Sequence, residues 1–597
     1  MLPVSTPLDC ALIRDAGRGC WLFFQGPLQV LVARRAEEVL PVLQQLDAAL
    51  DHPGCYAAGW VAYEAAPAFD PALLVRPAPA FPLAWFGLYR EPQVIPALPA
   101  VPADRPGAHF STWTASISPA AYTAAIDRIK DHIARGETYQ VNFTYRLTST
   151  FAGDPLALFF DLARAQNAPY AAFIHTGLFS ICSASPELFF ELDGDRITSK
   201  PMKGTAPRGR TQLEDQEQAT WLRNSAKDQA ENVMIVDMVR NDIGKIAHTG
   251  SVQVHDLYAV EKYPTVWQMV TTVTGKTFHG YVDIFRALFP PASITGAPKA
   301  RTMQIIAGLE TSPRRIYTGC IGYMQPGRRA QFNVAIRTVL IEHATSRAEY
   351  GTGGGITWGS TDAAEFEESK AKARILSVRM PEFSLLETLL WTPSGGYFLI
   401  DQHLRRLAGS AAYFDFPLDP QEVRRYLANL AAAFGRGAQK IRLLVDQHGQ
   451  MTSQVEPLRQ HEPQKVLRLC IAPNPIDLAD PFLYHKTTQR LVYEQALKAC
   501  AGAPGAPWDD VLLWNVHGEV TESCTANVVV ERDGEFYTPP LSCGLLAGTY
   551  RAWLLEQGRL KEAVIRLQDL HNYRHFYLIN SVRKQRVAQL AQPEGSG

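Results

Sequence analysis

"GTGGGITWGSTDAAEFEESKAKARILSVR", residues 351–379, joins a glycine run to a helix-like segment. The bare backbone amides of residues 351–357 can approach an anion closely, because glycine has no side chain to block them. Residues 364–379 have apolar residues at helical spacing, with Glu365 and Glu368 three positions apart. That spacing places both carboxylates on one helix face, about 4.5 Å apart along the axis. The stretch predicts an anion-binding loop beside an acidic helix.

A second acidic segment precedes it at residues 213–244, which we expect to form one long helix ending at a glycine. Its Glu231 sits among apolar residues that should face inward, and a buried carboxylate is costly unless it is paired or metal-bound. Together with Glu365 and Glu368 it offers what a Mg²⁺ site needs, since Mg²⁺ takes few protein carboxylates and accepts oxygens from the ligand. The alternative is that all three are solvated, as most glutamates are.

Lys203 lies in "SKPMKGTAPRG" (199–209), just after a strand-like stretch. It is either a solvated loop lysine or a nucleophile. A nucleophilic lysine must be partly neutral, which burial and the nearby cations Lys200 and Arg208 would favour by lowering its pKa.

The overall composition excludes several classes of protein. Lys and Arg number 58 against 59 Asp and Glu, so no global field attracts nucleic acid or an anionic membrane. No apolar run approaches the roughly 18 residues of a membrane span, and the first residues do not resemble a signal peptide. The nine cysteines are scattered without a CxxC pair, which argues against disulfides and zinc and favours a reducing cytoplasm.

The chain of 597 residues accommodates two large α/β or α+β domains. A Pro- and Ala-rich stretch at 92–106 predicts an extended connector inside the first half. Residues 119–135 predict a helix, and residues 139–151 and 180–192 each predict a strand. The pattern restarts with the strand-like SLLETLLW near residues 380–383, so we place the domains at 1–378 and 384–597.

The first half resembles the chorismate-utilising enzymes, most closely component I of the aminodeoxychorismate synthases, which are related to anthranilate synthases. The resemblance covers residues 1–378 and implies a large α+β sandwich with antiparallel sheets. It rests on segments in a shared order: YQVNFTYRL (139–147), SASPELFF (183–190), PMKGTAPRG (201–209), AENVMIVDMVRNDIG (230–244), PPASITGAPKARTMQII (290–306), YTGCIGY (317–323), FNVAIRT (332–338) and GGGITWGSTDAAEFEESKAKA (353–373).

This resemblance assigns roles to individual residues. The Mg²⁺ ligands would be Glu231, Glu365 and Glu368, with Asp228 close by. Arg337 and Tyr317 would hold a carboxylate or the enolpyruvyl group, for which a bidentate Arg is well suited. The ring would be lined by Gly204, Thr205, Gly353 and Gly355, and less securely by Thr295 and Lys299.

Lys203 distinguishes the subfamilies, because aminodeoxychorismate synthases have Lys where anthranilate synthases usually have Ala. A lysine that adds at C2 and expels the C4 hydroxyl would let ammonia enter at C4, splitting one hard step into two. Gln268 stands where some relatives have His, which is consistent with stopping at the amino compound. No cysteine lies in a Gly-x-Cys-x-Gly elbow, so ammonia would come from a separate glutamine amidotransferase or, failing that, from solution.

The second half resembles the class IV, fold-type IV pyridoxal phosphate enzymes, which include branched-chain and D-amino acid aminotransferases and aminodeoxychorismate lyase. That fold has two subdomains and is commonly dimeric, so a homodimer through this half is an open option. The resemblance rests on ETLLW (387–391), IDQHLRRLAGSAAYFDF (400–416), YHKTTQR (484–490), LLWNVHGEVTESCTANVVV (512–530), GLLAGTYR (544–551) and LINSVRK (578–584).

Here the resemblance makes Lys486 the Schiff-base lysine and Glu522 the partner of the pyridine nitrogen. Thr388 and Ser581 would face the substrate. The phosphate would lie at a helix N-terminus, held by Gly548, Thr549, Tyr550 and the positive charge of Arg406.

The two halves together imply a bifunctional enzyme of 4-aminobenzoate, hence folate, synthesis. The first half would aminate chorismate and the second would eliminate pyruvate. Two alternatives stay open for the second half: an aminotransferase, or a non-catalytic module that docks the amidotransferase.

Overall fold

The computed structural model describes residues 6–98, 107–376, 381–458, 465–501, 507–573 and 575–590. The chain divides into two compact units, and the segment Arg208–Gln218 belongs to the second one: the first unit is Met1–Pro207 with Ala219–Met380, and the second is Arg208–Gln218 with Pro381–Gly597. The expected connector lies outside the described residues from 99 to 106, as does the expected boundary from 378 to 380.

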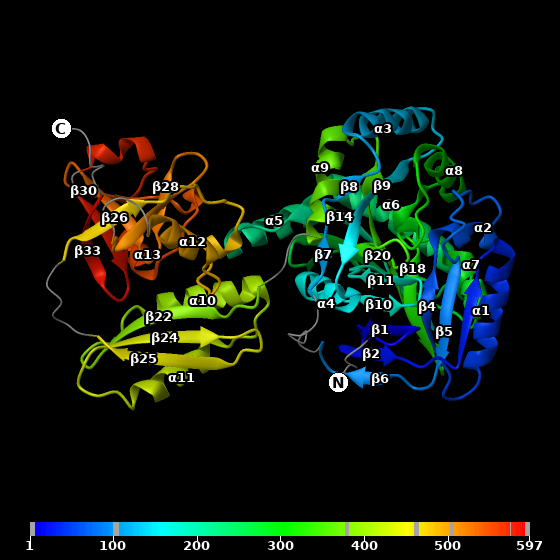
Figure 1. Ribbon diagram of the computed structural model, residues 1–597, viewed down its shortest axis with the longest axis horizontal. Helices are drawn as coiled ribbons and strands as arrows, with labels where there is room; N and C mark the ends of the chain where they lie inside the picture. The colour runs from blue at the N-terminus through cyan, green and yellow to red at the C-terminus, as the bar shows by residue number, and fades with distance from the viewer. Residues whose placement is uncertain are drawn as a thin grey trace. The chain divides into compact units, whose positions relative to one another are not determined.

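The first unit contains two large sheets whose neighbouring strands all run antiparallel (Figure 1). In sheet order, the first consists of β17 (Gly296–Ala297), β9 (Gln140–Ala152), β21 (Arg347–Ile356), β20 (Thr338–Glu342), β11 (Phe179–Ser183), β10 (Ala172–His175), β1 (Cys10–Asp15), β2 (Cys20–Phe24) and β6 (Gln93–Ile95), with β7 (His109–Phe110) and β8 (Thr114–Ala115) paired to β9. The second consists of β14 (Met202–Pro207), β16 (Val266–Lys276), β13 (Arg196–Lys200), β12 (Leu188–Asp193), β19 (Arg329–Val334), β18 (Cys320–Gln325), β4 (Tyr56–Val61), β5 (Ala84–Tyr89) and β3 (Gln29–Ala33), with β15 (Gln253–Lys262) paired to β16.

The sheets pack face to face, and helices cover their outer faces. Alternating side chains of β1 divide between two cores: Ile13 joins Trp60 and Tyr323 between the sheets, while Leu12 points out toward Phe159 of a covering helix. The antiparallel α+β sandwich expected for the first half is therefore confirmed. Its helices are α1 (Ala36–Leu50), α2 (Ala66–Phe69), α3 (Pro119–Ala134), α4 (Pro155–Gln166), α6 (Ala226–Gly244), α7 (Tyr281–Leu288), α8 (Lys299–Leu309) and α9 (Asp362–Ala373). Helix α5 (Gln212–Asn224) begins in the second unit and belongs to the first from Ala219 onward.

The helix expected at 119–135 and the strand expected at 139–151 are confirmed by α3 and β9. The single strand expected at 180–192 is wrong, because β11 and β12 belong to different sheets. Between them Pro186 has no N–H for a ladder, and the Ser185 hydroxyl donates instead to the Val334 carbonyl at 2.6 Å. The chain crosses here from one sheet to the other.

The single helix expected at 213–244 is also wrong, because it is divided into α5 and α6 at Ser225. Ser225 has extended dihedrals and its hydroxyl accepts the backbone N–H of Asp228, which makes it the N-cap of α6. The helix expected at 364–379 is α9 followed by a 3₁₀ turn at Arg374–Leu376, and residues from 377 lie outside the described part.

The second unit has two subdomains, as expected, each with its own sheet. The smaller sheet packs one face against two helices, and Leu385, Leu404 and Leu427 meet in their shared core. Its strands are β23 (Gly396–Tyr397), β22 (Leu385–Thr392), β24 (Gln439–Val445) and β25 (Met451–Pro457), and its helices are α10 (Ile400–Phe414) and α11 (Pro420–Ala431).

The larger sheet closes on itself, because β28 pairs with both β27 and β29. At the closing pair Glu522 lies opposite Asn527. Its order is β28 (Val520–Ser523), β27 (Asp510–Trp514), β26 (Leu467–Ile471), β33 (Lys584–Leu590), β32 (Phe576–Asn580), β29 (Asn527–Arg532), β30 (Glu535–Thr538) and β31 (Lys561–Glu562), with α12 (Leu491–Cys500) and α13 (Thr549–Glu556) beside it.

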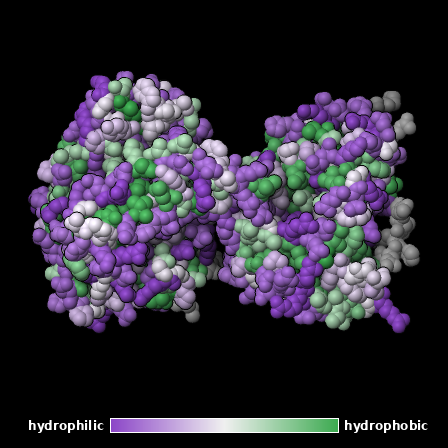
Figure 2. Space-filling view, turned by 180° about the vertical axis from the view of Figure 1, so that it is seen from behind, coloured by the Kyte–Doolittle hydropathy of each residue, from purple (hydrophilic) through white to green (hydrophobic). Residues whose placement is uncertain are grey.

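On the face of the molecule shown in Figure 2, hydrophobic residues form small patches separated by hydrophilic ones. Within the described part of the chain, no helix combines the length and apolar character needed to cross a membrane.

Replacing Ser225 with Ala removes the N-cap that begins α6. We expect the free energy of unfolding of the first unit to fall by about 1 kcal/mol, measured by urea denaturation. Ser225→Thr keeps a capping hydroxyl and should retain most of the stability. Equal loss in both variants would contradict the capping role.

Candidate active sites

A cavity of about 400 Å³ opens inside the first unit, between the two sheets' edges and α6 and α9. Most residues expected for this site line it, although they come from seven separate segments. They are Lys203, Gly204, Thr205, Asp228, Glu231, Gln268, Tyr317, Arg337, Gly353, Gly355, Glu365 and Glu368.

Lys203 lies inside this cavity, on β14. Burial lowers the pKa of its amine, and the cation Lys372 acts in the same direction, whereas Glu231 opposes the shift. The cations expected to do this are elsewhere: Lys200 lies 3.8 Å from Glu261, and Arg208 pairs with Asp215 in the second unit. Lys203 is therefore a half-buried strand lysine that lines a cavity and not a solvated loop lysine.

The glycine-rich strand β21 forms one wall of this cavity. Side chains of neighbouring residues fill the space that a Cβ would occupy at two of its glycines. A Cβ on Gly351 would lie 2.2 Å from the Tyr317 ring. A Cβ on Gly355 would lie 2.7 Å from both the Lys203 amine and the Gln140 amide. Glycine at these positions lets the tyrosine and the lysine approach the backbone of β21.

Three carboxylates face the cavity from α6 and α9. Burial raises the pKa of Glu231 and of Glu365, while Lys372 lowers that of Glu368, whose Oε1 it contacts at 2.7 Å. Among the described residues, no three acidic, His or Cys side chains already form a ligand set. Mg²⁺ needs only one or two protein carboxylates together with ligand oxygens. The carboxylates of Glu231 and Glu365, whose charged forms burial disfavours, fit such an ion.

Arg337 is a half-buried cation, and its guanidinium group donates to the Gln166 amide oxygen at 2.7 Å. Among the described residues no carboxylate forms an ion pair with it. Tyr317 faces the same cavity, and the Arg146 guanidinium lies 5.0 Å from its ring centre. A half-buried arginine without an anionic partner suits an anionic ligand.

Gln268 uses both ends of its amide within the wall of the cavity. It donates to the Gly204 carbonyl at 2.8 Å and accepts from the Thr205 hydroxyl at 3.1 Å. Thr295 is not among the lining residues, since its hydroxyl donates to backbone carbonyls of its own turn. Lys299 is likewise elsewhere and pairs with Asp242 at 2.8 Å.

Glu187 and Lys372 are two charged residues among the lining residues that were not assigned from the sequence. Glu187 follows the crossing between the sheets and is 4% exposed, and burial raises the pKa of its carboxyl to about 7 although Lys203 opposes this. Lys372 holds the Gly353 carbonyl at 2.9 Å. Both belong to recognised motifs, SASPELFF and EESKAKA, but nothing in the local pattern shows that they turn inward.

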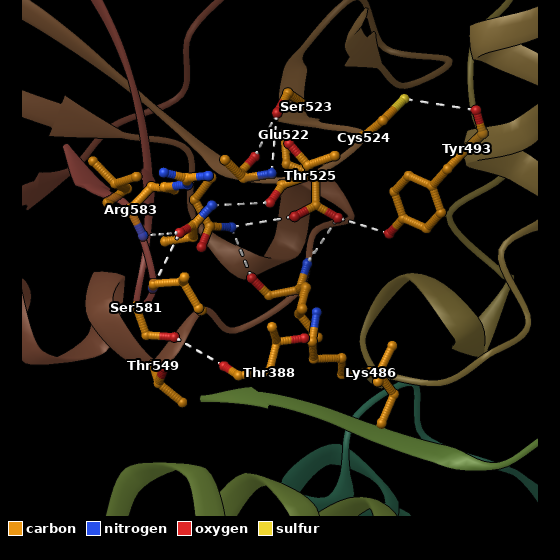
Figure 3. A pocket seen from close by; sticks show the side chains of 18 of the residues that line it. Thr388, Lys486, Tyr493, Glu522, Ser523, Cys524, Thr525, Thr549, Ser581 and Arg583 are labelled. Carbon is orange, nitrogen blue, oxygen red and sulfur yellow. Dashed lines mark hydrogen bonds between the residues drawn. The ribbon is translucent and has the colours of Figure 1, made fainter. Parts of the chain in front are cut away.

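A second cavity, of about 390 Å³, lies within the second unit (Figure 3). Figure 3 shows side chains from both subdomains converging on it, with Lys486 and Thr388 on one side and Glu522 on the other. Ser581 joins the two sides, because its hydroxyl donates to the Thr388 carbonyl at 3.3 Å. The expected residues that line it are Thr388, Arg406, Lys486, Glu522, Gly548, Thr549 and Ser581.

Two ionisable groups of this cavity are Lys486, which is half-buried, and Glu522, which is buried. Burial, followed by the charge of Arg406, lowers the pKa of Lys486 to about 8. Burial raises the pKa of Glu522 to about 7, although Tyr493 donates to it at 2.8 Å. Pyridoxal phosphate carries an aldehyde, which reacts with a neutral lysine, and a basic ring nitrogen, which a carboxylate can hold. Lys486 and Glu522 fit these two requirements.

Arg406 was expected to face a phosphate, but its guanidinium group is already paired with Glu387. Two nitrogens contact the two carboxylate oxygens at 2.9 and 2.6 Å. Burial alone would raise the pKa of Glu387, but Arg406 and His403 lower it to about 2. Any phosphate held here would depend on other groups.

The N-terminus of α13 supplies such groups. Its N-cap, Gly548, has no side-chain cap, and a Cβ there would lie 1.9 Å from the Asn527 amide oxygen. The uncapped amides and the helix dipole favour an anion. The side chain of Tyr550 points away into a stack with Trp553, so only its backbone remains available. The cavity is also lined by five cationic side chains that the sequence did not single out: Lys440, Arg442, Arg490, Arg583 and Arg586.

Residues 9–377 match the family of chorismate binding enzymes, and residues 384–589 match the class IV amino-transferases. Aminodeoxychorismate synthase component 1 of Escherichia coli (strain K12) is 40% identical over 270 residues, which are 45% of this chain and 59% of that protein. Anthranilate synthase component 1 3 of Haloarcula marismortui is 36% identical over 274 residues, 46% of this chain and 54% of that protein. The chain thus spans less than two thirds of these curated relatives.

Among solved structures, anthranilate synthase component I from Streptococcus pneumoniae TIGR4 shares the fold of the first unit. It is 23% identical with a TM-score of 0.52, and the match covers 63% of this chain and 93% of that one. Since relatives with different names match at similar identity, the reaction must be argued from the residues of the cavity.

Replacing Arg406 with Ala leaves the buried Glu387 carboxylate without its main partner. We expect the free energy of unfolding of the second unit to fall by about 3–5 kcal/mol in the cofactor-free protein, measured by thermal denaturation. Arg405→Ala, at the exposed neighbouring position of α10, is the control. An unchanged melting temperature for Arg406→Ala would show that the pair is not structural.

Proposed function

Because the chain belongs to the chorismate binding enzyme family, we propose that its first unit aminates chorismate at C4 to give 4-amino-4-deoxychorismate. The observation that carries this proposal is Lys203, a half-buried amine of lowered pKa in the cavity that Arg337 and the carboxylates also line. An amination at C2 would not need a lysine at this position, whereas replacement of the C4 hydroxyl with retained configuration needs two linked displacements.

In the proposed first displacement, the neutral Lys203 amine forms a bond to C2, the ring double bonds shift, and the C4–O bond breaks. The leaving hydroxyl takes a proton from the Glu187 carboxyl, whose raised pKa of about 7 keeps it protonated near neutral pH. In the second, ammonia bonds to C4, the double bonds shift back, and the bond to Lys203 breaks. The sum is exchange of a hydroxyl for an amine, with water released.

The charged groups around Lys203 would position the substrate. Arg337 would hold a carboxylate of the diacid in bidentate contact. Glu231, Glu365 and Glu368 would hold Mg²⁺, which supplies positive charge to the other carboxylate when it is bound. Lys372 offsets part of the negative charge of Glu368.

Ammonia would come from a separate glutamine amidotransferase. A glutaminase cysteine needs a lowered pKa, yet burial raises the pKa of eight of the nine thiols here, among them Cys182 and Cys320. The relatives named component 1 are consistent with such a partner. A homodimer through the second unit remains a prediction.

For the second unit we propose elimination of pyruvate from 4-amino-4-deoxychorismate to leave 4-aminobenzoate. Pyridoxal phosphate, bound to Lys486, would supply an electron sink for the bond-breaking steps. Glu522 would hold the ring nitrogen, and the amides of Gly548 and Thr549 would hold the phosphate. Lys486 would remove the proton at C4 and return one to the departing enolpyruvate. Arg442, exposed at the cavity, suits a carboxylate of the substrate.

A class IV aminotransferase is the second candidate for this unit, because the family match includes that reaction. It would convert an amino acid such as glutamate to its keto acid. A non-catalytic docking module is the third, and would show no visible absorbance band removable with borohydride.

The products from chorismate, Mg²⁺, ammonium and pyridoxal phosphate test both activities by mass spectrometry. We expect 4-aminobenzoate and pyruvate from the wild type, 4-amino-4-deoxychorismate alone from Lys486→Ala, and no aminated product from Lys203→Ala. Lys200→Ala, near the cavity but paired with Glu261, is the matched control and should remain active. Anthranilate as the product would overturn the first assignment, and keto acid from added glutamate the second.

Replacing Glu187 with Gln removes the proposed proton donor without changing its size. We expect kcat for amination to fall by about 10²- to 10⁴-fold while chorismate still binds, and the wild-type decrease in rate above about pH 7 to disappear. Glu191→Gln, four residues further along in β12 and outside the cavity, should leave both unchanged. An unaltered pH profile in Glu187→Gln would assign the proton to another group.

A further inference from the structure

The segment Arg208–Gln218, here called the strap, lies within the sequence of the first half but packs in the second unit. It follows β14, which carries Lys203, and its last residues form the start of α5. A Cβ on Gly209 would lie 2.1 Å from the Asp215 backbone nitrogen, so the strap folds back tightly on itself. Its position was not expected from the sequence, which assigned this stretch to the chorismate-binding half.

The strap contacts the two residues immediately before Lys486. The Arg210 carbonyl lies 3.2 Å from Nε2 of His485, and its guanidinium group donates to the Tyr484 hydroxyl at 3.3 Å. Because a carbonyl only accepts, Nε2 of His485 must carry the proton. Nδ1 then accepts from the Ser410 hydroxyl at 3.0 Å. Burial lowers the pKa of His485 to about 4, so the ring is neutral and its tautomer is set.

A second set of contacts fixes the strap to α10. The Tyr413 hydroxyl donates to the Gly209 carbonyl at 2.8 Å, and the Tyr413 ring lies 4.2 Å from that of His485. The Arg208 guanidinium lies 4.5 Å from the centre of the Tyr413 ring and is held by Asp215, with contacts of 2.7 and 2.8 Å. The strap, Tyr413 and His485 thus form one packed layer.

This layer does not include any residue that lines the second cavity, yet it holds the backbone from which Lys486 extends. The following peptide is tied to the small subdomain, because the Lys486 carbonyl accepts from the Leu386 N–H at 2.9 Å. The side chain of Lys486 is therefore aimed from a segment fixed on the strap side by His485 and on the sheet side by β22.

We propose that the strap is a positioning element of the second active site, which holds Tyr484 and His485 so that Lys486 projects into the cavity toward Glu522. The inference rests on the proposed role of Lys486. It assigns a stretch of the chorismate-binding half a role in the chemistry of the other half, and makes Tyr413 and His485 positioning residues.

The test compares Tyr413→Phe, which removes the hydrogen bond to the strap, with Tyr397→Phe. Tyr397 lies in the same subdomain and also donates to a backbone carbonyl, that of Leu427, at 2.8 Å, so the control loses an equivalent bond away from the strap. Asp215→Asn is a second variant, which weakens the pairing with Arg208 within the strap. All are studied as the full chain.

Competitive acetylation of the cofactor-free protein across pH measures the pKa of Lys486 by mass spectrometry. That value depends on burial, and on Arg406, Glu387, Arg490 and Glu522, which surround the amine. We expect Tyr413→Phe and Asp215→Asn to raise it by about half a unit as water enters, and to weaken the binding of pyridoxal phosphate about threefold. Tyr397→Phe should leave the pKa of Lys486 and the binding of pyridoxal phosphate unchanged, even if it lowers the melting temperature as much as Tyr413→Phe does.

Lys486 titrating alike in all four proteins would overturn the inference, as would an equal shift in Tyr397→Phe. A wild type that fails to bind pyridoxal phosphate would instead overturn the proposed function, while the acetylation would still decide whether the strap positions Lys486.

Discussion

The first active site depends on the bare backbone of β21. Its ladder with β9 runs from Arg347 to Ile356, so the glycines between 351 and 355 are fixed in register and cannot move aside. Because those residues lack side chains, the Tyr317 ring and the Lys203 amine fit against main chain. Methyl groups at these positions would occupy the space that the two groups share with a ligand, and the carboxylates of α6 and α9 would then surround a filled cavity.

Burial is the main cause of the lowered pKa of both proposed lysines. Lys203 has the cation Lys372 nearby, but that charge is itself held by Glu368, and Glu231 opposes the shift. Lys486 has Arg406 nearby, whose charge is largely offset by the buried Glu387. In both sites burial therefore lowers the pKa of the lysine most. Lys372 and Arg406 neutralise Glu368 and Glu387, which would otherwise raise that pKa again. Buried ion pairs of this kind set local charge more than they add stability.

The resemblance to two enzyme families predicted the sandwich and the two subdomains, and most of the residues that it assigned to a site line one of the two cavities. The predictions from sequence failed where a contact between residues far apart in the chain determines the local structure. Residues 180–192 have strand composition throughout, so the crossing that turns Glu187 inward left no periodic signal. Ser225 was read as helix interior because one serine in a long pattern does not distinguish a cap. Arg406 was assigned from its place in the HLRRL motif, and that motif does not show that Glu387 pairs with it.

The strap also bears on how such a gene can be divided. The chain passes between the units at three places, after residues 207, 218 and 380, so no single break separates one complete unit from the other. A gene that began at residue 381 would encode the second unit without its strap, and one that ended at 380 would leave that strap on the first product without its surroundings. Two independent genes could reproduce both units only by duplicating the strap. The two units of this protein are thus joined by interleaved segments of sequence and not by a single linker.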